Sequence, residues 1–465
     1  MADLVQRSVS RRTLLKGGAA VAALGGVSAF LAACGSSTAT TAPSAAAASA
    51  AAASTAPSAA AASTAPSAAA PSAAGSITFG SNYSDPVPQK AFADTMAAFT
   101  QKTGIQCTIN TVEHNKFQDT INAYLQATPD DCFTWFAGYR MRFFAAQGLA
   151  TDISDVWQTI GANFSDAFKT ASTGDDGKQY FVPLYNYPWV VIYRKSFWQA
   201  KGYQVPKTID DFTKLGDQMK KDGLIPLAFA DKDGWPAMGT FDILNMRLNG
   251  YDFHIGLMAG KEKWTDPKVV AVFQEWAKLL PYFDPQPLGL TWQEAAQKLI
   301  NKQAGMYFLG TFAGQQASDQ ATHDDLDFFP WPLHGTPYDS EMAIDAPIDG
   351  FMVSAKAKNL DGAKAAMEFL GSAEAANTYL ATDPNDVAAN KNADTSKYNA
   401  FQKSSATIIA GANKIAQFLD RDTRPDFAGA NGMQGFLQTF LKNPTQDLNK
   451  FLSGIQSFYD SLPPQ

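Results

Sequence analysis

The alternation of strand and helix patterns between Ser76 and Phe136 constrains the fold of this chain more than any other feature. Two stretches with apolar residues at helical spacing separate three short extended stretches. This β-α-β-α-β order predicts the opening of a doubly wound parallel sheet, in which ligands bind beyond the carboxyl ends of the strands. The strands are predicted at residues 76–80, 105–112 and 132–136, and the ligand loops at 82–86, 113–116 and 137–142.

The body from Gly75 to Gln465 is longer than one hydrophobic core usually serves, so two lobes are expected. The aromatic-rich run from Gln179 to Arg194 is extended and long enough to leave one lobe and enter another. A second extended run spans Ala346 to Ser354. Helices are expected at 196–201, 208–221, 267–280, 363–369 and 373–380, strands at 225–230 and 305–309, and a helical tail at 398–462 with a break at 420–432.

The first residues of the chain have the pattern of an export signal. The pair Arg11-Arg12 lies before a short Gly/Ala-rich apolar stretch, as in twin-arginine signals. A membrane-spanning helix is the alternative, but it needs about 20 strongly apolar residues, and this stretch is interrupted by glycines. The stretch ends in Leu31-Ala32-Ala33-Cys34, which resembles a bacterial lipobox. We therefore expect a signal peptide at 1–33 and a diacylglycerol anchor on Cys34, whose two acyl chains suffice for stable attachment.

From Ser36 to Ala74 the chain contains only Ala, Ser, Thr and Pro. Such a segment cannot bury a core and behaves as a flexible to semi-extended linker. Residues 34–75 are therefore interpreted as a tether between the membrane anchor and the globular body.

Charge and cysteine content narrow the possible partners. The chain carries 37 basic and 44 acidic residues, a net charge of −7, and removal of the basic leader makes it more negative. Nucleic acid is therefore not an expected partner. Outside the cytoplasm Cys107 and Cys132 could form a disulfide, but the strands that carry them are not expected to be adjacent.

Six segments, in order along the chain, resemble one family. They are similar to the carbohydrate-binding extracellular solute-binding proteins, the group that contains the maltose-binding protein. Two positions depart from the pattern, since Arg194 replaces a usual Asn and Phe312 a usual Trp. The segments are Phe99–Ile105, Val112–His114, Pro129–Leu149, Tyr187–Lys195, Gly305–Phe312 and Lys356–Leu370.

The resemblance implies an α/β, two-lobed, periplasmic-binding-protein-like fold of type II, with a doubly wound sheet in each lobe and hinge strands between them. The first lobe would hold residues 76–187 and 350–400, and the second 188–349 and 401–465. It also implies a monomeric, non-enzymatic protein without a cofactor on the outer face of the cell membrane. This protein would capture a sugar or short oligosaccharide in the interlobe cleft and deliver it to the permease subunits of an ABC importer.

A sugar offers a flat C–H face and a rim of hydroxyls, so its site needs aromatic planes and charged or amide groups. Tyr139, Arg140, Tyr187 and Phe312 fall on ligand positions of the family. Core packing is the alternative for the aromatic residues, a surface salt bridge for Arg140, and a turn or helix cap for the acids. The further candidates are Tyr83, Ser84, Asp85, Trp135, Asp231, Asp233, Trp235, Trp292, Trp331, Asp349, Asp422 and Asn431.

Motifs of catalysis are not found in the sequence. The four histidines lack metal-ligand spacing, and there is no Gly-x-Ser-x-Gly elbow or complete phosphate loop. Two carboxylates can meet in space from distant parts of a chain, so an exported glycoside hydrolase remains the alternative from another class. Capture of a peptide, a polyamine or a metal is the alternative within the binding class.

Overall fold

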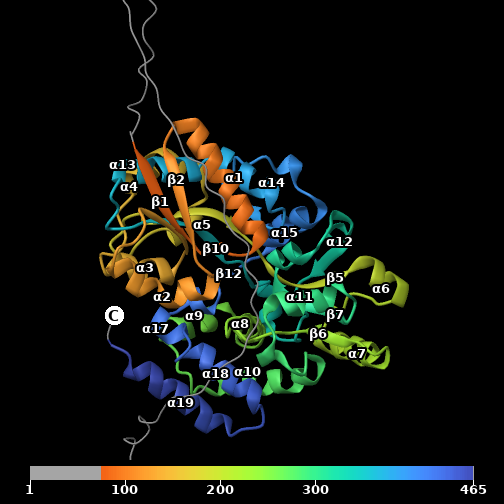
Figure 1. The fold of residues 1–465 in the computed structure, drawn as a ribbon. Helices are drawn as coiled ribbons and strands as arrows, with labels where there is room; N and C mark the ends of the chain where they lie inside the picture. The colour runs from red at the N-terminus through yellow and green to blue at the C-terminus, as the bar shows by residue number, and fades with distance from the viewer. Residues whose placement is uncertain (1–74, 464–465) are drawn as a thin grey trace, which may run out of the picture. The chain divides into compact units, whose positions relative to one another are not determined.

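The computed structural model describes residues 75–463, all of which belong to one compact unit. Cys34, Arg11 and Arg12 lie outside the described residues. The described part contains a six-stranded sheet, a four-stranded sheet and one pair of short strands, surrounded by helices (Figure 1).

The six-stranded sheet has the order β11-β4-β10-β3-β1-β2 and contains the predicted opening unit. β1 pairs in parallel with β2 and β3, and α1 and α2 connect these strands. β10 lies antiparallel between β3 and β4, and β11 pairs with β4. The strands are β1 (Ser76–Ser81), β2 (Gln106–Thr111), β3 (Cys132–Phe136), β4 (Val182–Asn186), β10 (Ile348–Val353) and β11 (Val387–Ala388).

The four-stranded sheet has the order β6-β7-β5-β8 and, like the six-stranded sheet, is mixed. Only β6 and β7 pair in parallel, because β5 arrives directly from the first sheet and runs antiparallel to both β7 and β8. The strands are β5 (Trp189–Arg194), β6 (Ile225–Ala228), β7 (Ala304–Gly310) and β8 (Leu326–Phe329).

The chain passes from one sheet to the other within the predicted extended run. β4 belongs to the first sheet and β5 to the second, and only Tyr187 and Pro188 separate them. The second run returns through β9 (Ile344–Asp345), which pairs with β12 (Ile415–Ala416), into β10. Both runs therefore connect elements of different sheets.

The predicted helices are present, but in the tail α16 and α17 occupy the expected break at 420–432 and further breaks lie on either side. The helices α4, α5, α8, α9, α11 and α12 were not predicted. Among the described residues the α-helices are α1 (Pro86–Thr103), α2 (His114–Gln126), α3 (Tyr139–Ala146), α4 (Ser154–Ile160), α5 (Asp166–Ala171), α6 (Lys195–Lys201), α7 (Ile209–Lys221), α8 (Pro236–Asn249), α9 (Tyr251–Met258), α10 (Pro267–Leu279), α11 (Trp292–Ile300), α12 (Gln320–Asp324), α13 (Leu360–Leu370), α14 (Ala373–Thr382), α15 (Ala400–Gly411), α16 (Leu419–Asp422), α17 (Pro425–Ala428), α18 (Met433–Lys442) and α19 (Leu448–Ser461). Six short 3₁₀ helices are η1 (Gly161–Asn163), η2 (Leu280–Tyr282), η3 (Pro287–Gly289), η4 (Thr311–Gln316), η5 (Pro337–Glu341) and η6 (Thr395–Lys397).

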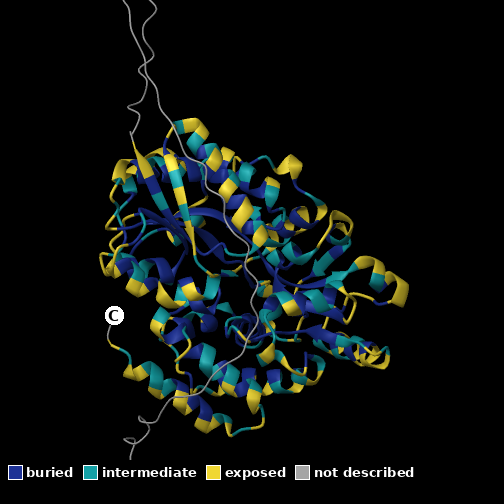
Figure 2. Cartoon of the chain, viewed as in Figure 1, coloured by how far each residue is buried: buried dark blue, intermediate teal, exposed yellow. Residues whose placement is uncertain are grey.

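The inner strands of both sheets are more deeply buried than the edge strand β2. Every residue of β3, β4, β7 and β10 is buried, whereas the edge strand β2 is partly exposed along its length (Figure 2). α8 is buried on nearly all sides. Within residues 75–463, neither α8 nor any other helix has the length and apolar character that a membrane span requires.

Cys107 and Cys132 are both free. Cys107 lies on β2 and Cys132 on β3, and β1 lies between these two strands. The expectation that the two cysteines are carried by non-adjacent strands is therefore confirmed.

Candidate functional site

A pocket lies between the two sheets. The empty space in it and at its open mouth amounts to about 790 Å³. One side is built by the segment after β1, the start of α2 and the ends of β3, β4 and β10. The other side is built by the start of β5, the N-terminal ends of α8 and α11, and η4. α16 completes the wall. The carboxyl ends of the parallel strands β1 and β3 thus reach the pocket, as expected for such a sheet.

The loop after β1 is held by a neighbouring strand. The backbone N–H of Asn82 donates to Oγ1 of Thr134 on β3 (2.9 Å), and that hydroxyl donates to Oδ1 of Asn82 (2.8 Å). The Asn82 side chain is buried, and its Nδ2 has no hydrogen-bond partner within residues 75–463. Because buried donors are normally paired, this amide is available to a ligand in the pocket.

A buried ionic network crosses the pocket between α16 and the first sheet. Nη1 of Arg421 donates to Oδ1 of Asp349 on β10 (2.6 Å), and Nη2 donates to the hydroxyl of Tyr187 (3.1 Å). The guanidinium also lies over the ring of Phe136, 4.1 Å from its centroid. The three polar side chains are only 6–7% exposed, with Arg421 and Asp349 at 7% and Tyr187 at 6%. Such a network offers charged donors and acceptors to a polar ligand.

The pKa values of these groups follow from burial and from their mutual attraction. Burial raises the pKa of Asp349, and the neighbouring Arg421 only partly offsets this. Burial opposes the charged form of Arg421, but the combined attraction of Asp349, Tyr187 and Asp420 outweighs it, so the pKa of Arg421 is raised. Burial lowers the pKa of His114, another residue of the pocket wall, which favours its neutral form at pH 7.

Two further polar side chains of the wall have unused hydrogen-bonding capacity. Asp386 lies just before β11 with 1% of its surface exposed, and its Oδ1 accepts no hydrogen bond from the described residues. Burial raises the pKa of Asp386, and the nearby carboxylates of Asp383 and Asp349 add to this effect. Nε1 of Trp235 likewise lacks a partner in the described part of the chain. Both groups are available to hydroxyls of a ligand.

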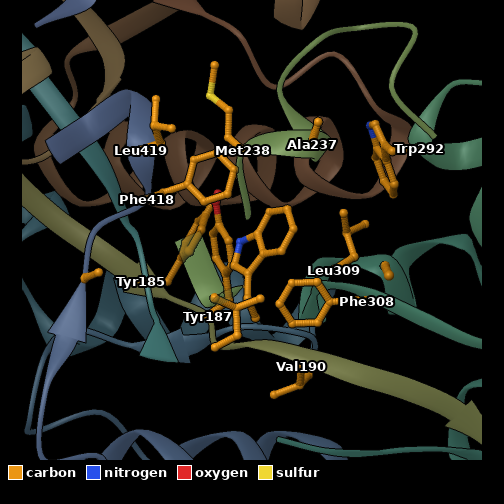
Figure 3. Packing of buried hydrophobic residues seen from close by; sticks show 14 of the residues in the cluster. Tyr185, Tyr187, Val190, Ala237, Met238, Trp292, Phe308, Leu309, Phe418 and Leu419 are labelled. Carbon is orange, nitrogen blue, oxygen red and sulfur yellow. The ribbon is translucent and has the colours of Figure 1, made fainter. Parts of the chain in front are cut away.

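Aromatic rings cover the opposite side of the pocket. The ring of Phe312 packs edge-on against Tyr187 (5.0 Å between centroids) and Trp292 (5.2 Å), and lies 6.2 Å from Trp235. Trp189 and Phe418 form a stacked pair at 4.8 Å. Figure 3 shows Phe418 close to Tyr185 and Tyr187, and Tyr185 belongs to β4 on the first side of the pocket. The pocket therefore combines ring faces with charged hydrogen-bonding groups.

One hydrogen bond joins the two sides of the pocket directly. Nε2 of Gln293, on α11, donates to Oδ1 of Asp85, which precedes α1 (3.1 Å). Both the loop after β1 and the start of α11 are thereby fixed at the same edge of the pocket.

The structure brings several of the predicted residues into the wall and leaves others outside it. Those in the wall are Tyr83, Ser84, Asp85, Tyr187, Trp235, Trp292, Phe312 and Asp349. Those outside it are Trp135, Tyr139, Arg140, Asp231, Asp233, Trp331, Asp422 and Asn431.

Arg140 is a support of the wall rather than part of it. Its Nη1 donates to Oε1 of Gln118 and lies 3.4 Å from Oδ2 of Asp420, and both partners line the pocket. Its guanidinium lies over the rings of Trp135 and Phe136. The structure thus places Arg140 outside the pocket wall, and a direct contact between Arg140 and a ligand stays a prediction.

Most of the remaining predicted residues outside the wall make packing contacts or hydrogen bonds within the protein. Trp135 packs in the core against Phe136 and Phe144, and Trp331 packs against Phe308. Tyr139 lies under the guanidinium of Arg142. The Asp231 carboxylate accepts the backbone N–H of Ala237 (2.9 Å), the Asp422 carboxylate accepts that of Gln417 (2.7 Å), Asp233 is half-buried, and Asn431 is exposed.

Sequence reasoning missed Arg421, the central cation of the pocket. Arg421 lies between two acids in the break predicted at 420–432, where a loose family match pointed to Asn431 instead. A basic residue flanked by Asp420 and Asp422 in a helix break was the available signal. Tyr185, Trp189, Asp386 and Phe418 were missed as well, because buried strand and loop residues look like core in a sequence.

No group of three or more metal-ligating side chains lies together within residues 75–463.

Comparisons with known proteins agree with this geometry. Residues 80–377 match the family model described as bacterial extracellular solute-binding protein. Among solved structures, the bacterial solute receptor AcbH has a TM-score of 0.81 and 48% sequence identity, covering 83% of this chain and 99% of the receptor. AcbH is described as having an exclusive substrate preference for β-D-galactopyranose.

Curated relatives are more distant. An uncharacterized ABC transporter extracellular-binding protein of Pyrococcus horikoshii is 27% identical over 60% of this chain and 63% of its own length, and a second one is matched over 33% of its length. The chain therefore spans less than two thirds of these relatives. The alpha-glucosides-binding periplasmic protein AglE of Rhizobium meliloti is 23% identical over 80% of this chain and 84% of its own length.

Proposed function

Because the chain belongs to the bacterial extracellular solute-binding proteins, we propose that it captures a sugar outside the cell and delivers it to the permease of an ABC importer. The observation that carries this proposal is the buried network of Arg421, Asp349 and Tyr187 beside the aromatic wall around Phe312. A pyranose has a C–H face that packs on aromatic rings and a hydroxyl rim that takes charged hydrogen bonds.

We propose a single pyranose, with β-D-galactopyranose as the first candidate. The 48% identity to AcbH, which extends over nearly all of that receptor, supports this choice. A short oligosaccharide is the alternative, favoured by the relationship to AglE.

Thermal unfolding against a panel of sugars tests the proposal. A ligand that binds only the folded protein stabilises it and so raises the melting temperature. At a free ligand concentration of about a hundred times Kd, the free energy of unfolding increases by about 2.7 kcal/mol. We expect galactose to raise the melting temperature, and maltose, a short peptide and spermidine to leave it unchanged. A rise with the peptide or spermidine alone would refute sugar capture, and a rise with maltose but not galactose would select the oligosaccharide alternative.

The proposal includes a division into two lobes, each of which supplies part of the pocket. The first lobe comprises residues 76–187 and 348–400, and the second 188–347 and 401–465, because β10 pairs with β3 and β4 of the first sheet from Ile348 onward. The passage of the chain from β4 to β5, which belong to different sheets, supports this division. A bound sugar that contacts residues of one lobe alone would contradict it.

Membrane attachment and export by the twin-arginine route are further parts of the proposal, and they rest on Cys34 and on the pair Arg11-Arg12. We expect Cys34→Ser to move the protein from the membrane fraction to the soluble exterior fraction, because the acyl chains have no other attachment point. We expect Arg11→Lys with Arg12→Lys to block export. Membrane retention of the serine variant would argue against the anchor, and normal export of the lysine variant would argue against the twin-arginine route.

A further inference from the structure

Phe418, a residue of the pocket wall, has an unusual backbone conformation. Its φ is +99° and its ψ is 144°, a combination that bulky residues rarely adopt. Such a conformation persists only where the surroundings determine it, and it is commonly found at functional sites. The Phe418 ring stacks on Trp189, so the conformation sets the position of a wall ring.

The turn that contains Phe418 is held by two carboxylates, of which that of Asp242 is fully buried and that of Asp422 is partly buried. The backbone N–H of Leu419 donates to Oδ2 of Asp242 (2.6 Å), and the backbone N–H of Gln417 donates to Oδ2 of Asp422 (2.7 Å). The carbonyl of Phe418 accepts the N–H groups of Arg421 (2.8 Å) and Asp422 (2.9 Å). Phe418 and Arg421 therefore hold their places through one short hydrogen-bonded turn.

Of these two carboxylates, Asp242 comes from outside the turn. It lies on α8, which is buried on nearly all sides, and the side chain of Asp242 is itself fully buried. Leu419 is also fully buried, so its N–H has no access to water as a substitute partner. The hydrogen bond from Leu419 to Asp242 thus ties the turn to a rigid helix on the far side of the pocket wall.

We infer that Asp242 is a positioning residue for the ligand site, which holds the 417–421 turn so that the Phe418 ring and the Arg421 guanidinium face the pocket. This inference rests on the proposed function for its affinity readout. The acceptor oxygen, rather than the negative charge, is the required feature, because the contact is a single hydrogen bond from a neutral backbone amide.

Two substitutions at one position separate the acceptor from the charge. Asp242→Ala removes the acceptor, and we expect the affinity for galactose to fall about tenfold or more. Asp242→Asn keeps an oxygen that can accept the Leu419 N–H, and we expect it to restore affinity to within about threefold of the parent. If Asp242 only stabilised the fold, the folded Asp242→Ala protein would bind as the parent does, and Asp242→Asn would have no lost affinity to restore.

Asp131 provides the matched control. Its carboxylate is also buried and also accepts backbone N–H groups, including that of Thr78 (2.8 Å), but it lies outside the pocket wall. Asp131→Ala should lower the melting temperature and leave the affinity of the folded protein unchanged. Parent-like binding by Asp242→Ala, or binding by Asp242→Asn as weak as that of Asp242→Ala, would overturn the inference.

A ligand-free crystal structure of Asp242→Ala decides the same question without any sugar. We expect the 417–421 turn to move and Phe418 to leave its positive φ. An unchanged turn would overturn the inference even if the proposed ligand were wrong, whereas failure of the parent to bind any sugar would count against the proposed function alone.

Discussion

Replacing Arg421 by alanine is expected to weaken sugar binding by about a hundredfold, or about 2.7 kcal/mol, because truncating one partner of a buried, hydrogen-bonded charge pair costs about 2–5 kcal/mol of binding free energy. The guanidinium donates to both Asp349 and Tyr187, and each of these is buried. Without Arg421, the largest effect that offsets burial is lost, so the pKa of Asp349 should rise further. The variant thus loses the charged donor Arg421, and the carboxylate of Asp349 is no longer held in its orientation toward the ligand.

Isothermal titration with galactose measures this effect. Arg421→Lys keeps the charge but lacks the planar fork that reaches two partners, so it should recover only part of the lost affinity. Arg424→Ala is the control, because Arg424 is similarly buried and forms a two-point ion pair with Asp426 (2.6 and 2.7 Å) but does not line the pocket. Parent-like affinity of Arg421→Ala would remove the network from the binding site.

Gly239→Ala is expected to have the second largest effect. Gly239 lies on α8, where a β-carbon would come within 2.4 Å of the Trp189 ring and 2.9 Å of the Phe418 ring. In an ordinary helix this substitution stabilises by up to about 1 kcal/mol. Here the stacked pair must shift into the pocket instead, so we expect a loss of about 1–3 kcal/mol in stability and of tenfold or more in affinity.

The comparison with another helical glycine isolates the steric cause. Gly454 on α19 has open space at its β-carbon position, and Gly454→Ala should raise the melting temperature slightly and leave affinity unchanged. Calorimetric binding and thermal unfolding of both variants check the expectation. If Gly239→Ala binds galactose as tightly as Gly454→Ala, the Trp189–Phe418 pair does not shape the ligand space.

The sequence predicted the parts of the fold that depend on local pattern. The strands β1, β2 and β3 and their connecting helices follow from apolar spacing and from stops such as Gly104, whose φ of +77° ends α1 in a left-handed cap. The mixed direction of the second sheet was not predictable in the same way, because the side-chain pattern of β5 does not depend on the direction of its neighbours.

The site residues that directly follow a strand could be predicted from the sequence. Those contributed by segments distant in sequence from these strands were harder to predict. Tyr83, Asp85 and Tyr187 follow strands in this way and reach the pocket. Arg140 also follows a strand, but its helix turns the side chain behind Gln118 and Asp420. Arg421 reaches the pocket from the C-terminal tail, through a turn whose conformation depends on Asp242 in another helix, and no local pattern encodes that contact.

A crystal structure of the protein with bound galactose tests the central claim most directly. We expect one sugar between the two sheets, with ring hydroxyls within hydrogen-bonding distance of Arg421 and Asp349. The C–H face of its ring should lie against the aromatic wall that includes Trp235 and Phe312. A sugar bound elsewhere on the protein, or one in the pocket that contacts neither Arg421 nor Asp349, would contradict it.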